Sequence, residues 1–174
     1  MVINYEANKS PLEAIVEKAT NIRNKYFKKG KKWANFLACT RQGAIIIGRN
    51  LFVHAGIIPE IARKYKVKDI NNMMRKYLLD KFTDDNPELN EMVNSSDYSP
   101  FWYRPFGQIL PDTDGSKDEY CQNKVIPTLK MYNVNNIIIG HTPQTFTESG
   151  EGINKTCTMN EEDKQFNVIR VDIG

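Results

Sequence analysis

Short apolar runs alternate with stretches of helical spacing along this chain, and the pattern predicts a mixed α/β fold. Two runs rich in isoleucine and valine, at 44–54 and 135–140, have the length and composition of buried strands. Residues 48–50, Gly-Arg-Asn, interrupt the first run with a turn signal, so we expect a hairpin there. The second strand of this hairpin would end at His54, and the strand at 135–140 would end at His141.

Helical patterns occupy the stretches before and after the first pair of strands. Ser10 is a good helix cap with Glu13 three positions later, and apolar residues then recur at helical spacing to about Phe27. Residues 59–89 carry a second apolar helical face, and the segment 59–98 is predicted to be mainly helical.

The remaining third of the chain combines a helix, a strand and loops. Residues 118–132 have helical spacing, and we expect Pro127 either to kink this helix or to mark its start. Residues 167–173 alternate as a strand does, whereas 148–163 is rich in glycine and charge and is predicted to be a surface loop. Residues 112–116 lack the glycine and glutamate spacing of an EF-hand, so we expect a turn there rather than a calcium loop.

Composition and charge are those of an ordinary globular chain. The 174 residues are 40% hydrophobic and 26% charged, with a formal net charge of +3. No apolar run is long enough to cross a membrane, and the N-terminus lacks the layout of a signal peptide. The basic stretch 28–32 has no aromatic platform beside it, so we expect a solvated loop, with neither nucleic acid nor membrane as a partner.

The cysteines give little sign of metal binding or cross-linking. Cys39, Cys121 and Cys157 are far apart and odd in number, and they form neither a C-x-x-C motif nor a recognisable disulfide framework. We therefore expect a reducing setting and a cytoplasmic location.

The two histidines of the sequence follow apolar strands in the same way. His54 and His141 each lie at the C-terminal end of a predicted strand, close to Gly56 and Gly140. Ligand sites gather at the C-terminal ends of strands in α/β sheets, and an imidazole there can bind Mn, Fe or Zn. A single histidine after a strand is more often packed or exposed than a ligand, so position alone leaves both alternatives open.

An arginine lies in a stiff aromatic segment between the two histidines. Arg104 follows Trp102 and Tyr103, and Pro100 and Pro105 restrict the backbone on both sides. Its planar guanidinium suits bidentate contact with a phosphate. The alternative is a cluster at the edge of the core in which Arg104 stacks on a ring and pairs with an acid.

Taken in order, these segments resemble a known family. Residues 52–57 (Phe-Val-His-Ala-Gly-Ile) resemble the His-(Gly/Ala)-Gly motif of the phosphoprotein phosphatases, which belong to the calcineurin-like metallophosphoesterases. Residues 138–143 (Ile-Ile-Gly-His-Thr-Pro) resemble the later Gly-His-Thr motif, and 102–104 resembles the arginine segment of the bacterial-type branch. The set is most similar to the Shewanella-like and phage-type protein phosphatases, over about residues 44–174.

The resemblance implies a fold and a site. The fold would be α/β (α+β), a two-sheet mixed β-sandwich flanked by helices, with 10–32 as a helical insert. The site would hold two divalent metal ions (Mn, Fe or Zn) bridged by a hydroxide that attacks phosphorus. His54 and His141 match two ligands of one metal ion, and Arg104 matches a residue that holds the substrate phosphate. The substrate would be a phosphoprotein, modified on serine, threonine or tyrosine, or another phosphomonoester.

The acidic motifs of this family do not occur in the sequence. Gly-Asp-x-His-Gly, Gly-Asp-x-x-Asp-Arg-Gly and Gly-Asn-His-Glu, which supply the remaining metal ligands, are all absent. Two neutral imidazoles cannot by themselves hold a pair of divalent ions. We therefore expect residues 1–174 to be the C-terminal portion of a single phosphoesterase domain, which needs its missing N-terminal half as a partner.

Two other functions compete with this one. The chain could be a catalytically inactive binding module that keeps a phosphatase shape, because the acidic ligands are missing. A weaker alternative is RNA binding through residues 28–32, which would be strongly salt-dependent.

Overall fold

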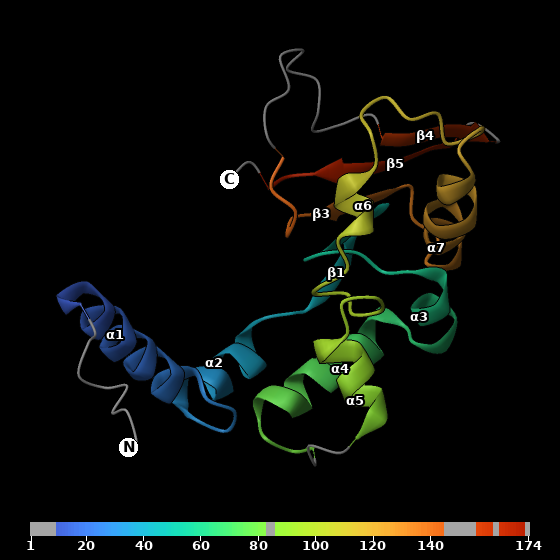
Figure 1. Ribbon diagram of the computed structural model, residues 1–174. Coiled ribbons are helices and arrows are strands. Elements are labelled where there is room, and N and C mark those ends of the chain that lie inside the picture. Colours follow the sequence, from blue (N-terminus) through green and yellow to red (C-terminus); the bar gives the residue numbers. More distant parts are fainter. Residues whose placement is uncertain (1–9, 83–85, 145–155, 162–163, 173–174) are drawn as a thin grey trace. The chain divides into compact units, whose positions relative to one another are not determined.

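The chain forms two compact units in a computed structural model that describes residues 10–82, 86–144, 156–161 and 164–172 (Figure 1). The first unit comprises residues 1–41 and 75–81, and the second comprises 42–74 and 82–174. Among the described helices, none is long and apolar enough to cross a membrane.

The first unit consists of α1 (Pro11–Phe27), α2 (Lys32–Thr40) and the last turn of α4. The predicted capping box starts α1: the Glu13 N–H donates to Ser10 Oγ at 3.3 Å, and the Ser10 N–H donates to Glu13 Oε2 at 2.7 Å. Gly30, between the two helices, has φ +71° and donates its N–H to the Leu78 carbonyl oxygen at 2.8 Å. The positive φ favours glycine at this turn.

The second unit is built on a mixed five-stranded sheet in the order β1-β2-β3-β5-β4 (Figure 1). The strands are β1 (Ala44–Ile47), β2 (Asn50–Val53), β3 (Asn136–Ile139), β4 (Thr156–Glu161) and β5 (Lys164–Arg170). β2, β3 and β5 are parallel neighbours, while β1 and β4 pair antiparallel at the two edges. The predicted hairpin is confirmed as β1–β2.

Short helical elements accompany this sheet. They are α3 (Pro59–Lys64), α4 (Val67–Leu78), α5 (Pro87–Asn94), α6 (Pro105–Gln108), η2 (Cys121–Val125) and α7 (Ile126–Met131). The mixed α/β class with a mixed sheet flanked by helices is thereby confirmed.

The helical face predicted over 59–89 is divided into separate helices. α3 ends at Lys64, and the next residue, Tyr65, has an extended backbone. α4 begins at Val67, and the Asp69 carboxylate in its first turn accepts the Lys66 N–H at 3.0 Å. Pro127 is the second residue of α7, but helical backbone is already present through η2 (Cys121–Val125), so Pro127 lies inside a continuous helical stretch and does not mark its start.

One face of the sheet forms the core of the second unit. Side chains that alternate along the three parallel strands are almost completely buried: Leu51, Val53, Ile137, Ile139 and Val168. They join one cluster with Ile61 of α3, Phe106 of α6 and Leu129 of α7. The opposite face carries an apolar row across four strands, because Ile45 pairs with Phe52, Phe52 with Ile138, and Ile138 with Ile169. Ile45 and Phe52 remain 43% and 37% exposed.

The segment predicted as a surface loop contains a strand. β4 lies within 148–163, and the rest of that segment lies outside the described residues. Thr156 and Cys157 are buried, so this stretch is held by packing that its polar composition does not reveal. The partner that makes the strand possible is β5, which is adjacent in sequence and returns antiparallel.

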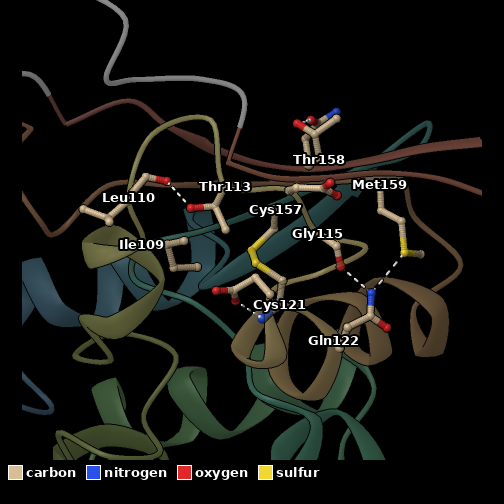
Figure 2. The surroundings of a disulfide bond; sticks show 12 residues. Ile109, Leu110, Thr113, Gly115, Cys121, Gln122, Cys157, Thr158 and Met159 are labelled. Carbon is tan, nitrogen blue, oxygen red and sulfur yellow. Dashed lines mark hydrogen bonds between the residues drawn. A yellow bond between two sulfur atoms is a disulfide. The ribbon is translucent and has the colours of Figure 1, made fainter.

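A disulfide joins Cys121 of η2 to Cys157 of β4 (Figure 2). The expectation that the cysteines form no disulfide was therefore wrong. The two residues are 36 positions apart, and they meet where β4 lies beside residues 113–115, just before η2. Beside the bond, Gln122 donates to the Gly115 carbonyl oxygen and contacts the Met159 sulfur at 3.3 Å. Cys39 is free and exposed.

Candidate functional site

Three parallel strands bring three candidate side chains to one edge of the sheet. His54 directly follows β2, His141 lies two residues after β3, and Asp172 lies two residues after β5. Since β2, β3 and β5 are parallel neighbours in this order, their C-terminal ends lie side by side. The sequence predicted that His54 and His141 occupy equivalent positions, and the structure brings them together.

The two imidazole rings face each other through one nitrogen each. His54 Nε2 and His141 Nδ1 are 3.0 Å apart, with ring centroids 4.8 Å apart and an interplanar angle of 63°. The backbones also meet, because the Gly140 N–H donates to the His54 carbonyl oxygen at 2.8 Å. His54 is exposed and His141 is half-buried, so the pair is reachable from solvent.

His141 adopts a backbone conformation that few residues tolerate. Its φ is +66°, in the left-handed region where histidine, asparagine and aspartate are enriched among non-glycine residues. The Thr142 N–H closes a tight turn to the Gly140 carbonyl oxygen at 2.8 Å. This turn directs the imidazole toward His54 instead of continuing the line of β3.

The aromatic-arginine segment lies directly against His141. The Trp102 ring is 5.4 Å from the His141 ring at an angle of 88°, and Arg104 Nη1 donates to the His141 carbonyl oxygen at 3.1 Å. Arg104 itself is exposed at the start of α6, so most of its guanidinium donors remain available for another acceptor. The structure thus brings the three predicted site residues together.

The loop that carries His141 is tightly connected to α6. A Cβ placed on Gly107 would lie 2.4 Å from the Thr142 Cβ, so only glycine fits at this contact. Gln144 reinforces it by donating from Nε2 to the Gly107 carbonyl oxygen at 3.0 Å and to the Thr142 carbonyl oxygen at 2.7 Å. Arg104, which precedes α6, and His141 are therefore held in a fixed relation.

The surroundings of His141 favour a neutral imidazole. Burial, followed by the charges of Arg104 and His54, lowers the pKa of His141 from its ordinary value. Its Nε2 is buried, and the Trp102 backbone beside the ring opposes the lowering of the pKa. A neutral imidazole is the form that binds metal ions.

The nitrogen pair fits one part of a metal centre. His54 Nε2 and His141 Nδ1 are within hydrogen-bond distance of each other, and both nitrogens could turn toward one ion as two of its ligands. Among the described residues, however, no group of three or more histidine, cysteine, aspartate or glutamate side chains could hold a metal ion. His54 and His141 therefore fit as two ligands of one metal ion, and the described residues do not fit a complete site for two metal ions.

Asp172 is a neighbour that the sequence analysis missed. Its carboxylate acts electrostatically on His141, where it opposes the lowering of the pKa. Its backbone oxygen accepts the Gln144 N–H at 2.8 Å, which connects the ends of β3 and β5. The strand predicted over 167–173 included Asp172, so its position two residues after β5 became visible only in the structure.

The acidic segment at 112–116 is a turn, as predicted. The Asp114 carboxylate accepts the Ser116 N–H at 2.9 Å and the Ser116 hydroxyl at 2.6 Å, and it pairs with Lys117 at 3.0 Å. Ser116, followed by Lys117, lowers the pKa of Asp114 to about 2. The carboxylate is thus occupied by its own turn.

Comparison with known sequences gives two relatives and no matching family model. The mimiviral protein R398 of Acanthamoeba polyphaga mimivirus is 36% identical over 163 residues, which cover 87% of this chain and 63% of that protein. Protein C1840.07c of Schizosaccharomyces pombe is 33% identical over 94 residues, covering 53% of this chain and 25% of that protein. Both relatives are described as uncharacterized, and the chain spans less than two thirds of either.

Comparison with solved structures identifies the fold. The cold-active protein-tyrosine phosphatase of a psychrophilic Shewanella species matches with a TM-score of 0.50 and 25% sequence identity. The fold is phosphatase-like. The match covers 77% of this chain and 34% of the phosphatase, and a point mutant of a cold-active protein tyrosine phosphatase gives the same values. The phosphatase-like chain thus corresponds to about a third of the solved enzyme.

Proposed function

We propose that this chain carries part of the site of a metal-dependent phosphomonoesterase of the calcineurin-like, Shewanella-like kind that acts on phosphoproteins. The observation that carries the proposal is the meeting of His54, His141 and Arg104 at the C-terminal ends of adjacent parallel strands. The likeness to protein-tyrosine phosphatases supports phosphotyrosine as one substrate class.

Each residue has a distinct role in this proposal. His54 Nε2 and His141 Nδ1 would be ligands of one of two divalent ions (Mn, Fe or Zn), which supply a polarised hydroxide and neutralise phosphate charge. The exposed Arg104 guanidinium would bind the phosphate oxygens of the substrate. The hydrogen bond from Arg104 to the His141 carbonyl oxygen fixes the distance between the phosphate-binding group and the ligand pair.

The acidic ligands would come from outside residues 1–174. The longer relatives leave room for such a segment, since this chain spans 63% of the mimiviral protein. Asp172, beside His141, would contribute negative charge at the same edge of the sheet. In this arrangement the chain is the C-terminal portion of one domain, with residues 10–32 as its helical insert.

The test is hydrolysis of p-nitrophenyl phosphate with Mn²⁺ by a longer polypeptide that contains this chain. His54→Asn and His141→Asn are each expected to lower kcat by about 100-fold or more, because each removes a ligand. Asparagine tolerates the positive φ at position 141, so the backbone is kept. Near-normal turnover in either variant would contradict the ligand assignment.

Arg104→Ala separates the phosphate contact from the metal ligands. It is expected to lower kcat/KM by about 10- to 100-fold, the loss of a charged hydrogen bond of about 1.5–3 kcal/mol. Mn²⁺ binding, followed by electron paramagnetic resonance, should be reduced much less in Arg104→Ala, which keeps both imidazoles, than in the histidine variants. Arg63→Ala, an exposed arginine at the end of α3, is the matched control and should leave both measurements unchanged.

A catalytically inactive phosphatase-like binding module is the second candidate. It is favoured by the absence of any group of three ligand side chains among the described residues. Phosphopeptide binding that depends on Arg104, with no turnover in the longer polypeptide at any divalent ion, would support this candidate and contradict the first.

A further inference from the structure

Helix α1 exposes a continuous apolar face. None of its residues is buried, although Leu12, Ile15, Val16, Ile22 and Tyr26 are all large and apolar or aromatic. Their exposed fractions lie between 49% and 69%. Scattered exposed apolar residues need no explanation, but a contiguous patch of this kind marks an interaction surface.

The spacing along α1 is that of a helix-pairing seam. Positions 12, 15, 19, 22 and 26 are separated by three and four residues in alternation, which is the spacing of the a and d positions in a heptad repeat. Ala19 is the middle residue of the 17-residue helix. A small side chain at the centre allows another helix to approach closely at that point.

The apolar surface continues onto α2 within the same unit. The Phe27 ring stacks on Trp33 at 6.3 Å, and Trp33 meets Phe36 edge to face at 5.9 Å. A groove of about 530 Å³ runs along the junction, lined by Ala19, Ile22, Arg23, Tyr26, Phe27 and Trp33. The seam of α1 and the rings of α2 therefore form one surface, here called the α1 face.

We propose that the α1 face is a dimerisation surface, on which α1 pairs antiparallel with α1 of a second copy about a two-fold axis at Ala19. The sequence is partly self-complementary about this residue. Leu12 of one copy faces Tyr26 of the other and Val16 faces Ile22, whereas Ile15 faces the aliphatic stem of Arg23. A two-fold interface requires this kind of reciprocal matching.

Charge supports the same orientation. Glu13 lies six residues before Ala19 and Lys25 lies six residues after it, so each carboxylate of the dimer faces an ammonium group of the other copy. A parallel pair would bring Glu13 against Glu13 and Lys25 against Lys25. The acidic first turn and basic last turn of α1 thus favour the antiparallel arrangement.

The area is sufficient for a stable dimer. Eight large side chains of α1 and α2 are between 43% and 69% exposed: Leu12, Ile15, Val16, Ile22, Tyr26, Phe27, Trp33 and Phe36. At roughly 150–200 Å² for each full side chain, they expose on the order of 700 Å². A standard interface buries about 800 Å² per partner.

Sedimentation velocity of the full chain tests the association. We expect a dimer, and we expect Ile22→Glu to shift it to a monomer because two carboxylates would enter the seam. The matched control is Ile47→Glu, which adds the same charge at an exposed isoleucine of β1 in the other unit and should remain a dimer.

Cysteine cross-linking tests the orientation, in a Cys39→Ser background that removes the free thiol. Ala19→Cys lies on the two-fold axis and should give a disulfide-linked dimer on a non-reducing gel. Leu12→Cys faces Tyr26 and should not cross-link to itself, whereas Leu12→Cys with Tyr26→Cys should.

Four results would overturn the proposal. The first three are a monomeric chain, a dimer that Ile22→Glu does not affect, and self-cross-linking through Leu12→Cys. The fourth is a longer polypeptide that sediments as a monomer while its α1 is protected from hydrogen exchange. The last result would show that another part of a longer chain covers the α1 face.

Discussion

Tyr132 shows how a half-buried side chain contributes to the loss of stability of the fold at high pH. Its hydroxyl donates to the Tyr65 carbonyl oxygen at 2.8 Å, and burial raises the pKa of Tyr132 to about 12. The ordinary value in an unfolded chain is about 10. Between these two values the folded protein binds the proton and the unfolded chain releases it, so the free energy of unfolding falls as pH rises through this range.

Tyr132→Phe is expected to flatten this alkaline loss of stability. Phenylalanine cannot ionise, so the free energy of unfolding should change less between about pH 10 and pH 12 than it does in the unmodified chain. At neutral pH the variant should lose about 1 kcal/mol with its hydrogen bond. Urea unfolding at several pH values measures both effects, with the exposed Tyr98→Phe as control. An equal alkaline slope in Tyr132→Phe and the unmodified chain would contradict the assignment.

At the residue scale, the sequence predicted which side chains would meet and could not predict their geometry. His54 and His141 were recognised by their positions after strands, and Arg104 by its aromatic surroundings. The positive φ of His141 depends on the turn closed by Thr142 and on contacts from α6, which are separated from it in sequence. Asp172 was missed because the strand predicted over 167–173 included it, whereas β5 ends at Arg170.

At the scale of elements, the Cys121–Cys157 bond decides how firmly β4 is held. β4 is an edge strand that pairs with β5 with a shift in register, and outside that pairing it makes an isolated bridge between Thr158 and Asp114. The disulfide connects this strand to η2, whose Cys121 is completely buried in the core. A covalent link over 36 residues limits the freedom of the unfolded chain.

Removal of this bond is expected to lower stability by about 3 kcal/mol. Thermal unfolding of the chain should therefore show a lower Tm with a reducing agent than without it. Cys39→Ser should shift neither value, because Cys39 is exposed and free. Cys121→Ser with Cys157→Ser should abolish the effect of the reducing agent. An unchanged Tm on reduction would show that the bond does not hold β4.

Prediction of the elements succeeded where the pattern was local. The capping box of α1, the β1–β2 hairpin and the strand before His141 were all visible in a few neighbouring residues. β4 was missed because Thr156, Thr158 and Asn160 are polar, and the strand exists through its pairing with β5. The disulfide was missed for the same reason, since its two halves meet only in the folded sheet.

At the scale of the whole molecule, the two faces of the sheet differ in what covers them. One face belongs to the core, whereas the row formed by Ile45, Phe52, Ile138 and Ile169 leaves two large side chains more than a third exposed. A groove of about 320 Å³ follows this row and reaches His54. Apolar surface of this extent favours association with other apolar surfaces.

Phe52→Thr is expected to reduce aggregation of the chain on heating. Threonine is β-branched and favours strands, and the substitution removes the aromatic ring from the exposed row. Static light scattering during a thermal ramp should rise later in the variant. Thr40→Ser, an exposed position at the end of α2, is a control that should leave the scattering unchanged. Equal scattering in Phe52→Thr and the unmodified chain would show that the row is not the surface responsible.

The order of the strands was beyond the sequence, because it depends on pairings between distant segments. β2 and β3 are neighbours although more than eighty residues separate Asn50 from Asn136. The resemblance to phosphatases predicted a sheet flanked by helices, which the structure confirms. The division into two units is likewise not marked by any change in composition along the chain.

The edge-to-face contact between Trp102 and His141 makes the intrinsic fluorescence of Trp102 a probe of the site. The sequence has two tryptophans, and Trp33 belongs to the other unit. Trp102 is 52% exposed and its indole is 5.4 Å from the imidazole, so its emission responds to whatever occupies that histidine. In a Trp33→Phe variant, Trp102 is the one remaining tryptophan of the sequence, and a paramagnetic ion bound at His141 would quench its fluorescence. The metal occupancy of the site could then be followed by fluorescence without an added label.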